Sequence, residues 1–164
     1  EYSLTASPAG TNVACPGTKV GAKAPHHTTS PSPGVTKSMR SNTHRDTRPE
    51  LAVRHLLHAR GLRYRVDMAP WSNRRRRADI VFIRQRLAVF IDGCFWHGCP
   101  EHATLPVTNA DYWRPKLAKN IERDRETTAM AEAEGWRVLR IWEHVPPEEA
   151  AELIAQTLEA RRDE

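Results

Sequence analysis

Residues 78–99 of this 164-residue chain read ADIVFIRQRLAVFIDGCFWHGC. Two apolar runs, 78–83 and 87–92, are separated by the short polar segment 84–86, a pattern typical of two buried strands joined by a tight turn. We therefore predict an antiparallel hairpin over these residues. Each run carries one aspartate, and cysteine and histidine follow directly, so the strongest structural and chemical signals of the chain meet in one segment.

Further elements are predicted on both sides of this hairpin. They are a helix over 47–61, a strand over 62–68, a loop over 70–77, a helix from about Trp113 to Gly135, a strand over 136–142 and a helix from Pro147. The order α-β-β-β-α-β-α predicts one three-layer α/β domain of about 125 residues.

Local signals define the ends of the helices. Thr47 and Glu50 have the spacing of a capping box, in which Thr47 accepts from the amide of Glu50 while Glu50 reaches back. We expect Gly61 to end this first helix. Pro115 must lie in the first turn of the next helix or mark a kink, because proline lacks the amide that a helix interior requires.

The composition fits a globular protein, with 39% hydrophobic and 27% charged residues. No apolar run approaches the ~18 residues of a membrane span, and no secretory signal pattern opens the sequence. Three cysteines are too few for a disulfide framework, which favours a reducing compartment. Residues 1–36 contain nineteen Ser, Thr, Pro or Gly and predict a disordered tail.

Positive charge is concentrated in one part of the chain. Residues 37–92 carry fourteen Lys or Arg against five Asp or Glu, while residues 93–164 carry nine against fourteen. This imbalance indicates a polyanionic partner, nucleic acid first, or simply a solvated basic face.

Cys94, Cys99 and His102 are spaced to ligate one zinc ion. His144 follows the last predicted strand, where it could return to the same end of the sheet as a fourth ligand. Two cysteines and two histidines leave no open position, so this zinc would be structural. The alternatives are two unbound core cysteines with surface histidines, or a shell in which His97 takes the place of His102.

Asp79 lies within one apolar strand and Asp92 ends the next. A carboxylate is costly to bury unless it is paired or ligates a cation. Two carboxylates at adjacent strand ends suit Mg²⁺, which would polarise a phosphate and activate a water. His97 could take the proton of that water. The alternatives are that the aspartates cap turns or pair with arginines, and that His97 is structural.

The aromatic residues fall into two groups. Phe95 and Trp96 lie between the predicted zinc ligands, and Trp113 begins a helix beside two basic residues. Exposed aromatic rings next to positive charge can stack on bases or wedge between them. For the other tryptophans we expect packing in the core; they are Trp71, Trp136 and Trp142.

With these motifs, residues 36–144 resemble the very-short-patch DNA mismatch repair endonucleases, the Vsr family. The matching segments are 37–47, 77–82, 93–97, 112–113, 119–124, 135–138 and 142–143, of which Gly93–His97 is the most specific. The resemblance implies a restriction-endonuclease-like fold of the PD-(D/E)xK class with a mixed central sheet and a structural zinc site, over residues 37–164.

The resemblance also implies an activity: Mg²⁺-dependent cutting of one DNA strand 5′ of the thymine in a T·G mismatch that arises when 5-methylcytosine deaminates. The expected partner is mismatched double-stranded DNA, with general mismatch-repair proteins as further contacts. A monomer in a bacterial cytoplasm, associated with the nucleoid and not with a membrane, is expected.

By position, the resemblance makes Asp79 the metal-binding aspartate, with the backbone carbonyl of Ile91 as a second ligand. It makes His97 the catalytic histidine and places Glu50 and Asp124 around the active site.

For DNA binding, the resemblance implies that Phe95, Trp96 and Trp113 wedge into the duplex beside the mismatch, while Met39 enters from the other side. Cys94, Cys99 and His144 match its zinc-ligand positions. Further DNA contacts are expected from Lys119, Asn120 and Arg77, and the run Arg74–Arg77 could hold phosphates.

The sequence departs from the family pattern at several positions. Asp92 stands where some members have a catalytic histidine, and it could ligate the metal directly. The usual lysine of the fold class is absent because Cys94 occupies its position, which favours His97 as the proton acceptor. The ligand His102 is inferred from spacing, and His144 replaces a cysteine.

Two other functions are compatible with the sequence. One is a zinc-stabilised DNA-binding module without catalysis, and the other is a restriction-type nuclease that acts on unmismatched sites. The presence of both Asp79 and His97 favours an enzyme over the binding module.

Overall fold

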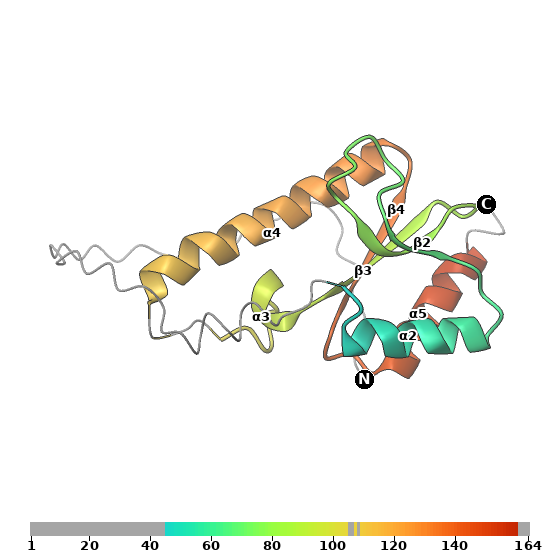
Figure 1. The fold of residues 1–164 in the computed structure, drawn as a ribbon, viewed down its shortest axis with the longest axis horizontal. Coiled ribbons are helices and arrows are strands. Elements are labelled where there is room, and N and C mark those ends of the chain that lie inside the picture. Colours follow the sequence, from blue (N-terminus) through green and yellow to red (C-terminus); the bar gives the residue numbers. More distant parts are fainter. Residues whose placement is uncertain (1–44, 105–106, 108, 161–164) are drawn as a thin grey trace, which may run out of the picture. The chain divides into compact units, whose positions relative to one another are not determined.

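A computed structural model of the chain describes residues 45–104, 107 and 109–160. The predicted tail over 1–36 lies outside these residues. The same holds for the motif residues 37–44, which include Met39. The described elements are α2 (Arg48–Ala59), β1 (Arg65–Met68), β2 (Ala78–Phe82), β3 (Leu87–Asp92), α3 (Cys94–His97), α4 (Ala110–Ala133), β4 (Arg137–Trp142) and α5 (Pro147–Ala160) (Figure 1). This is the predicted order, with the short helix α3 as an addition.

The four strands form one mixed sheet in the order β1-β2-β3-β4. The pairs β1–β2 and β2–β3 are antiparallel, and the second pair confirms the predicted hairpin. β4 pairs parallel with β3, and α4 lies in the long connection that parallel pairing requires. The register sets Phe90 beside Arg140 and Asp92 beside Trp142, so both strands end at the same edge.

Helices cover both faces of the sheet, with α2 and α5 on one side and α4 on the other (Figure 1). The first face buries Val53, Leu57, Ile80, Phe82, Leu87, Val89, Ile141, Ala150, Ala151, Ile154 and Leu158. The second buries Ala69, Trp71, Ala78, Val81, Ala88, Phe90, Ala131 and Trp136. Strand side chains alternate between faces, so β2 and β3 contribute to both cores. Within the described residues, no helix combines the length and apolar character needed to cross a bilayer.

The start of α2 differs in detail from the predicted capping box. Thr47 is the N-cap, but its hydroxyl donates to Oε1 of Glu50 (2.8 Å) instead of accepting from the Glu50 amide. Oε2 of Glu50 accepts from the amide of Asp46 (3.0 Å) and from Arg54 (2.6 Å). An ionised carboxylate can only accept hydrogen bonds, and Glu50 therefore accepts from all three of these groups. Gly61 follows the helix with a φ of +75°, in agreement with its predicted role.

Other element ends also need correction. The first strand begins at Arg65 and not at Leu62. α4 begins at Ala110, so Trp113 lies one turn inside the helix. Pro115 lies beyond the first turn, which excludes the first of its two predicted positions. Since Pro115 has no amide hydrogen, the carbonyl four residues before it cannot receive its usual helical bond. Trp142 is half-buried and belongs to neither core cluster.

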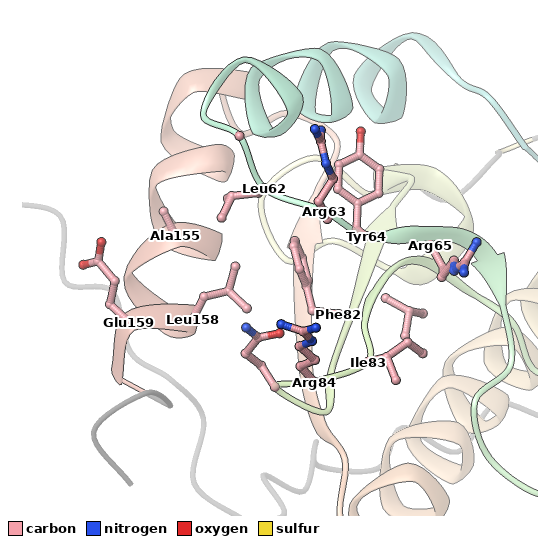
Figure 2. A pocket seen from close by; sticks show the side chains of 13 residues that line it. Leu62, Arg63, Tyr64, Arg65, Phe82, Ile83, Arg84, Ala155, Leu158 and Glu159 are labelled. Carbon is pink, nitrogen blue, oxygen red and sulfur yellow. The ribbon is translucent and has the colours of Figure 1, made fainter.

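A pocket of about 820 Å³ lies where β1, the β2–β3 turn and the end of α5 meet (Figure 2). Its lining combines apolar residues such as Tyr64 and Phe82 with Arg63, Arg65 and Arg84. The hairpin register places this pocket at the closed end of β2–β3, whereas Asp79 and Asp92 lie toward the open end. The predicted chemical residues are therefore found in another part of the fold.

The packing of α5 against the sheet makes a prediction about stability. Ile154 is fully buried, so Ile154→Ala should lower the free energy of unfolding by about 2–5 kcal/mol through lost burial and a residual cavity. Urea unfolding followed by circular dichroism measures this. Glu159→Ala, an exposed change on the same helix, should stay within about 0.5 kcal/mol of the wild type. Equal effects of the two changes would contradict the described core.

Candidate active site and metal centre

Acidic side chains from three elements lie near one another at the open end of the hairpin: Glu50 on α2, Asp79 on β2 and Asp92 at the end of β3. Glu50 and Asp92 are buried, with 4% and 5% of their surface exposed. Oδ2 of Asp79 accepts a hydrogen bond from the amide of Ile91 (2.7 Å). Burial, joined by the charges of Glu50 and Asp92, raises the pKa of Asp79 to about 7 despite that hydrogen bond.

Two of these three carboxylates have an arginine partner. Arg54 donates to Glu50 (2.6 Å), and Arg140 forms a forked pair with Asp92 (2.7 and 2.9 Å). Asp79 has no ion pair with any described residue. Asp79 is half-buried, has like charges nearby and forms no ion pair, and a carboxylate in such surroundings is the kind of group that a divalent cation stabilises. The residues around Asp79 therefore fit a metal ion.

Asp92 is engaged differently from Asp79. Both of its carboxylate oxygens face the Arg140 guanidinium, so Asp92 forms the pairing with arginine that was the predicted alternative to metal binding. The forked geometry is the strong form of a carboxylate–guanidinium interaction. The structure therefore gives Asp92 an ion-pair partner within the chain.

His97 and Asp124 are brought together, although 27 residues separate them. The His97 Nδ1 lies 2.5 Å from Oδ2 of Asp124 and 3.7 Å from Oδ1 of Asp92. The carboxylate fixes the proton of the imidazole on Nδ1, which leaves the Nε2 lone pair available. No described residue is in hydrogen-bond contact with Nε2.

Charges around His97 change the pKa of both partners. Burial alone would lower the pKa of His97, but the hydrogen bond to Asp124 and the charges of Asp92 and Asp124 raise it above its ordinary value. Burial would raise the pKa of Asp124, but His97 and Arg140 lower it. Asp124 therefore stays ionised and can hold the imidazole in place.

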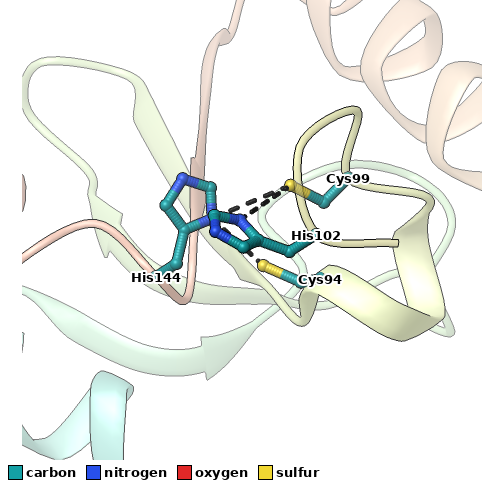
Figure 3. A group of neighbouring side chains, drawn as sticks. All are labelled: Cys94, Cys99, His102 and His144. Carbon is teal, nitrogen blue, oxygen red and sulfur yellow. Dashed lines mark hydrogen bonds between the residues drawn. The ribbon is translucent and has the colours of Figure 1, made fainter. Parts of the chain in front are cut away.

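The four predicted zinc ligands lie together, at the point where β3 enters α3 and where β4 ends (Figure 3). The ligand atoms of Cys94, Cys99, His102 and His144 all lie within 4.8 Å of one another. The Cys94 sulfur is 3.1 Å from Nδ1 of His144, and the Cys99 sulfur is 3.8 Å from Nδ1 of His102. Tetrahedral zinc with sulfur and nitrogen ligands needs separations of about 3.3–3.8 Å. The cluster can therefore bind a metal ion.

Local backbone geometry and an outer carboxylate support this cluster. Gly98 has a φ of +70° at the end of α3, and a Cβ there would lie 2.7 Å from Ile121. Its conformation lets the chain reverse, so that the Cys99 amide bonds to the Cys94 carbonyl (3.0 Å). Nε2 of His144 faces Glu101 at 3.8 Å, an arrangement typical of histidines that bind metals through the other nitrogen.

The aromatic residues predicted to wedge into DNA also gather in space. Phe95 and Trp96 lie on α3 and not in a loop, and both contact Trp113 of α4 with ring centroids 5.6 and 5.9 Å apart. Tyr112 extends the cluster and is 55% exposed. The Lys116 ammonium lies 5.4–5.7 Å from the rings of Trp96, Tyr112 and Trp113. This partly exposed aromatic surface with a cation suits contact with bases.

The other residues predicted to contact DNA differ in whether they are free or bound to other parts of the chain. Lys119 is exposed on α4, and the Asn120 amide donates to the carbonyl of Trp96 (3.3 Å). Arg77 pairs with Asp67 (2.6 Å), and Arg76 pairs with Glu126 (3.0 Å). The arginine run is therefore partly held by contacts within the chain.

Sequence reasoning missed Arg54 and Arg140 as partners of the acidic site. Arg54 follows Glu50 by four residues on a helix, where side chains meet. Arg140 is a charged residue in the predicted strand 136–142, which is the signal that singled out Asp79.

Comparisons with known proteins show the family to which the chain belongs. The family model for the DNA mismatch endonuclease Vsr matches residues 33–102, which include Glu50, Asp79, Asp92, His97 and three of the four cluster residues.

Among relatives, the type II nicking enzyme V.NaeI of Lentzea aerocolonigenes is 44% identical over 127 residues, which cover 76% of each chain. The type II nicking enzyme V.XorIIP of Xanthomonas oryzae pv. oryzae is 45% identical over 60% of this chain and 71% of its own. The DNA mismatch endonuclease Vsr of Escherichia coli K12 is 39% identical over 65% and 67%. This chain belongs to the Vsr family of DNA mismatch endonucleases and is a DNA endonuclease.

Proposed function

We propose that this endonuclease nicks one strand of DNA 5′ of the thymine in a T·G mismatch left by deamination of 5-methylcytosine. The observation that carries the proposal is the adjacency of Trp96 and His97 on one helical turn. A mismatched pair is cheaper to unstack than a paired one, so a wedge of aromatic rings favours it. A wedge next to the proton acceptor would place the cut beside the mismatch. Cutting of one strand also agrees with the relatives named as nicking enzymes.

The catalytic metal proposed for this reaction is Mg²⁺, held by Asp79 and the backbone carbonyl of Ile91. When bound, Mg²⁺ polarises the scissile phosphate and lowers the pKa of an attacking water. His97 accepts the proton of that water at Nε2, while Asp124 holds Nδ1. Because Asp92 is paired with Arg140, its proposed part in the site is to position its neighbours more than to bind the metal.

The fold class proposed for the domain is the restriction-endonuclease-like PD-(D/E)xK class. The four-stranded mixed sheet with its carboxylates at the open end of β2–β3 supports this assignment. The enzyme is proposed to act as a monomer, on DNA in the bacterial cytoplasm, with general mismatch-repair proteins as further contacts.

Nicking of end-labelled duplexes tests the proposed specificity. With Mg²⁺, the protein should cut a duplex 5′ of the mismatched thymine in at least one cytosine-methyltransferase context, and it should spare the same duplex with a T·A pair. EDTA should abolish the cut. Equal cutting of both duplexes would favour a restriction-type nuclease, and tight binding without a nick in every context would favour a DNA-binding module.

The ion proposed for the Cys/His cluster is structural zinc. One zinc per chain is expected by elemental analysis, and its removal should lower the melting temperature by about 10 °C or more, because structural zinc contributes folding energy. Cys99→Ala should lose the zinc, whereas His55→Ala, an exposed histidine on α2, should keep it. An unchanged melting temperature of the zinc-free protein would contradict a structural role.

Asp79→Asn should remove activity and increase stability. A folded-state pKa of about 7 means that native Asp79 keeps a proton that the unfolded chain has released, so stability falls as the pH rises from about 4 to 7. The amide removes this penalty, and metal-free Asp79→Asn should be more stable than the wild type by about 2 kcal/mol at pH 8. Nicking should fall by about 100-fold or more.

Urea unfolding at pH 4 and pH 8 measures the stability effect of Asp79→Asn. The gain should shrink toward pH 4, where both the folded and the unfolded chain carry the proton. Asp111→Asn, an exposed change at the start of α4, serves as the control and should change stability by no more than about 0.5 kcal/mol. A destabilised Asp79→Asn protein at pH 8 would show that Asp79 is not strained by its surroundings.

A further inference from the structure

We infer that Arg140 is a positioning residue that sets the orientation of the His97 imidazole through Asp124 and Asp92. The inference rests on the proposed role of His97 in DNA cleavage and extends it to a residue on another strand. Arg140 lies on β4 beside Phe90 of β3, two residues before the end of each strand.

The Arg140 guanidinium uses all three of its nitrogens on this network. Nε and Nη2 form the forked pair with Asp92, and Nη2 also lies 3.0 Å from Oδ1 of Asp124. Nη1 donates to the backbone carbonyl of Asp124 (3.3 Å) and lies 3.5 Å from the Thr128 hydroxyl. One planar group therefore joins the end of β3 to two successive turns of α4.

The two carboxylates then face His97. Oδ1 of Asp124 is held by Arg140, while its Oδ2 contacts Nδ1 of His97. Oδ1 of Asp92 lies between the guanidinium and the imidazole, 2.9 Å from Nη2 and 3.7 Å from Nδ1. Since each carboxylate is fixed on its far side by Arg140, the plane of the imidazole and the direction of Nε2 depend on the guanidinium.

The guanidinium itself is held rigidly. Its carbon lies 4.7 Å from the centre of the Phe90 ring, and only 24% of the side chain is exposed. A planar fork stacked on a ring defines directions that a flexible ammonium does not. If Arg140 only neutralised the charges of Asp92 and Asp124, any cation at this position would serve. If it orients His97, the planar guanidinium with its several donors is required. Lysine and arginine at position 140 therefore distinguish the two roles.

The test compares Arg140→Lys with Arg137→Lys, an exposed arginine on the same strand with no described side-chain partner. On the duplex that the wild type nicks, Arg140→Lys should lower the single-turnover rate about 10–100-fold. Its DNA affinity without divalent metal should stay within about 3-fold of the wild type, because Arg140 faces the network and not the aromatic surface. Arg137→Lys should match the wild type in both.

A spectroscopic readout separates positioning from simple charge balance. The low-field proton signal of Nδ1 of His97, assigned by its loss in His97→Gln, should be present in the wild type and in Arg137→Lys. It should shift or disappear in Arg140→Lys. Arg140→Gln, which keeps a planar end group, provides a second variant if Arg140→Lys fails to fold.

The outcomes separate this inference from the proposed function. A wild-type rate and an unchanged Nδ1 signal in Arg140→Lys would overturn the role of Arg140 and leave the proposed function standing. A loss of affinity equal to the loss of rate would also overturn it, since Arg140 would then act in binding. Absence of any nicking by the wild type would remove the proposed function and this role together.

Discussion

The parallel pairing of β3 with β4 is the constraint on which both chemical centres depend. It sets Asp92 beside Trp142 and Phe90 beside Arg140. Two residues beyond each strand end, Cys94 and His144 then meet at 3.1 Å. The same register brings Arg140 within reach of Asp92. A slip of one residue would turn Arg140 to the opposite face, so the metal cluster and the charge network are fixed by one alignment.

The acidic site shows how the fold tolerates several buried charges in one place. Arg54 and Arg140 form ion pairs with Glu50 and Asp92, whereas the hydrogen-bond partner of Asp79 is the amide of Ile91 and its carboxylate forms no ion pair with a described residue. A fold selected for stability alone would pair or replace such a group, because a desolvated carboxylate without an ion pair costs free energy. Its retention agrees with a general trade-off in which active sites keep strained groups at the expense of stability.

Much of this arrangement could be predicted from the sequence, for identifiable reasons. The strands of the hairpin were predictable because each is a continuous apolar run, and the metal cluster because three of its residues are close in sequence. Helix α3 was missed because four residues show no helical period. The partner of Asp92 was also missed, since the chain offers many arginines and only the β3–β4 register selects Arg140. The sequence feature that could have pointed to Arg140 is its position within a mostly apolar strand.

The Cys/His cluster has a further consequence for the short helix α3. An isolated turn of four residues is unstable in water, because nucleation fixes several dihedral angles for one hydrogen bond. In α3 the first residue is Cys94, and Cys99 follows two residues after the last, so a shared metal ion would clamp both ends.

Between these two ends lie Trp96 and His97, for which we propose roles in DNA binding and in catalysis. Trp96 turns to the aromatic cluster and His97 to Asp124. These contacts restrain both side chains, so the ring proposed to meet the duplex and the imidazole proposed to meet the attacking water keep a defined separation. A structural metal at this point would therefore do more than stabilise the fold, because under the proposed function it would couple the recognition of a distorted base pair to the position of the cut.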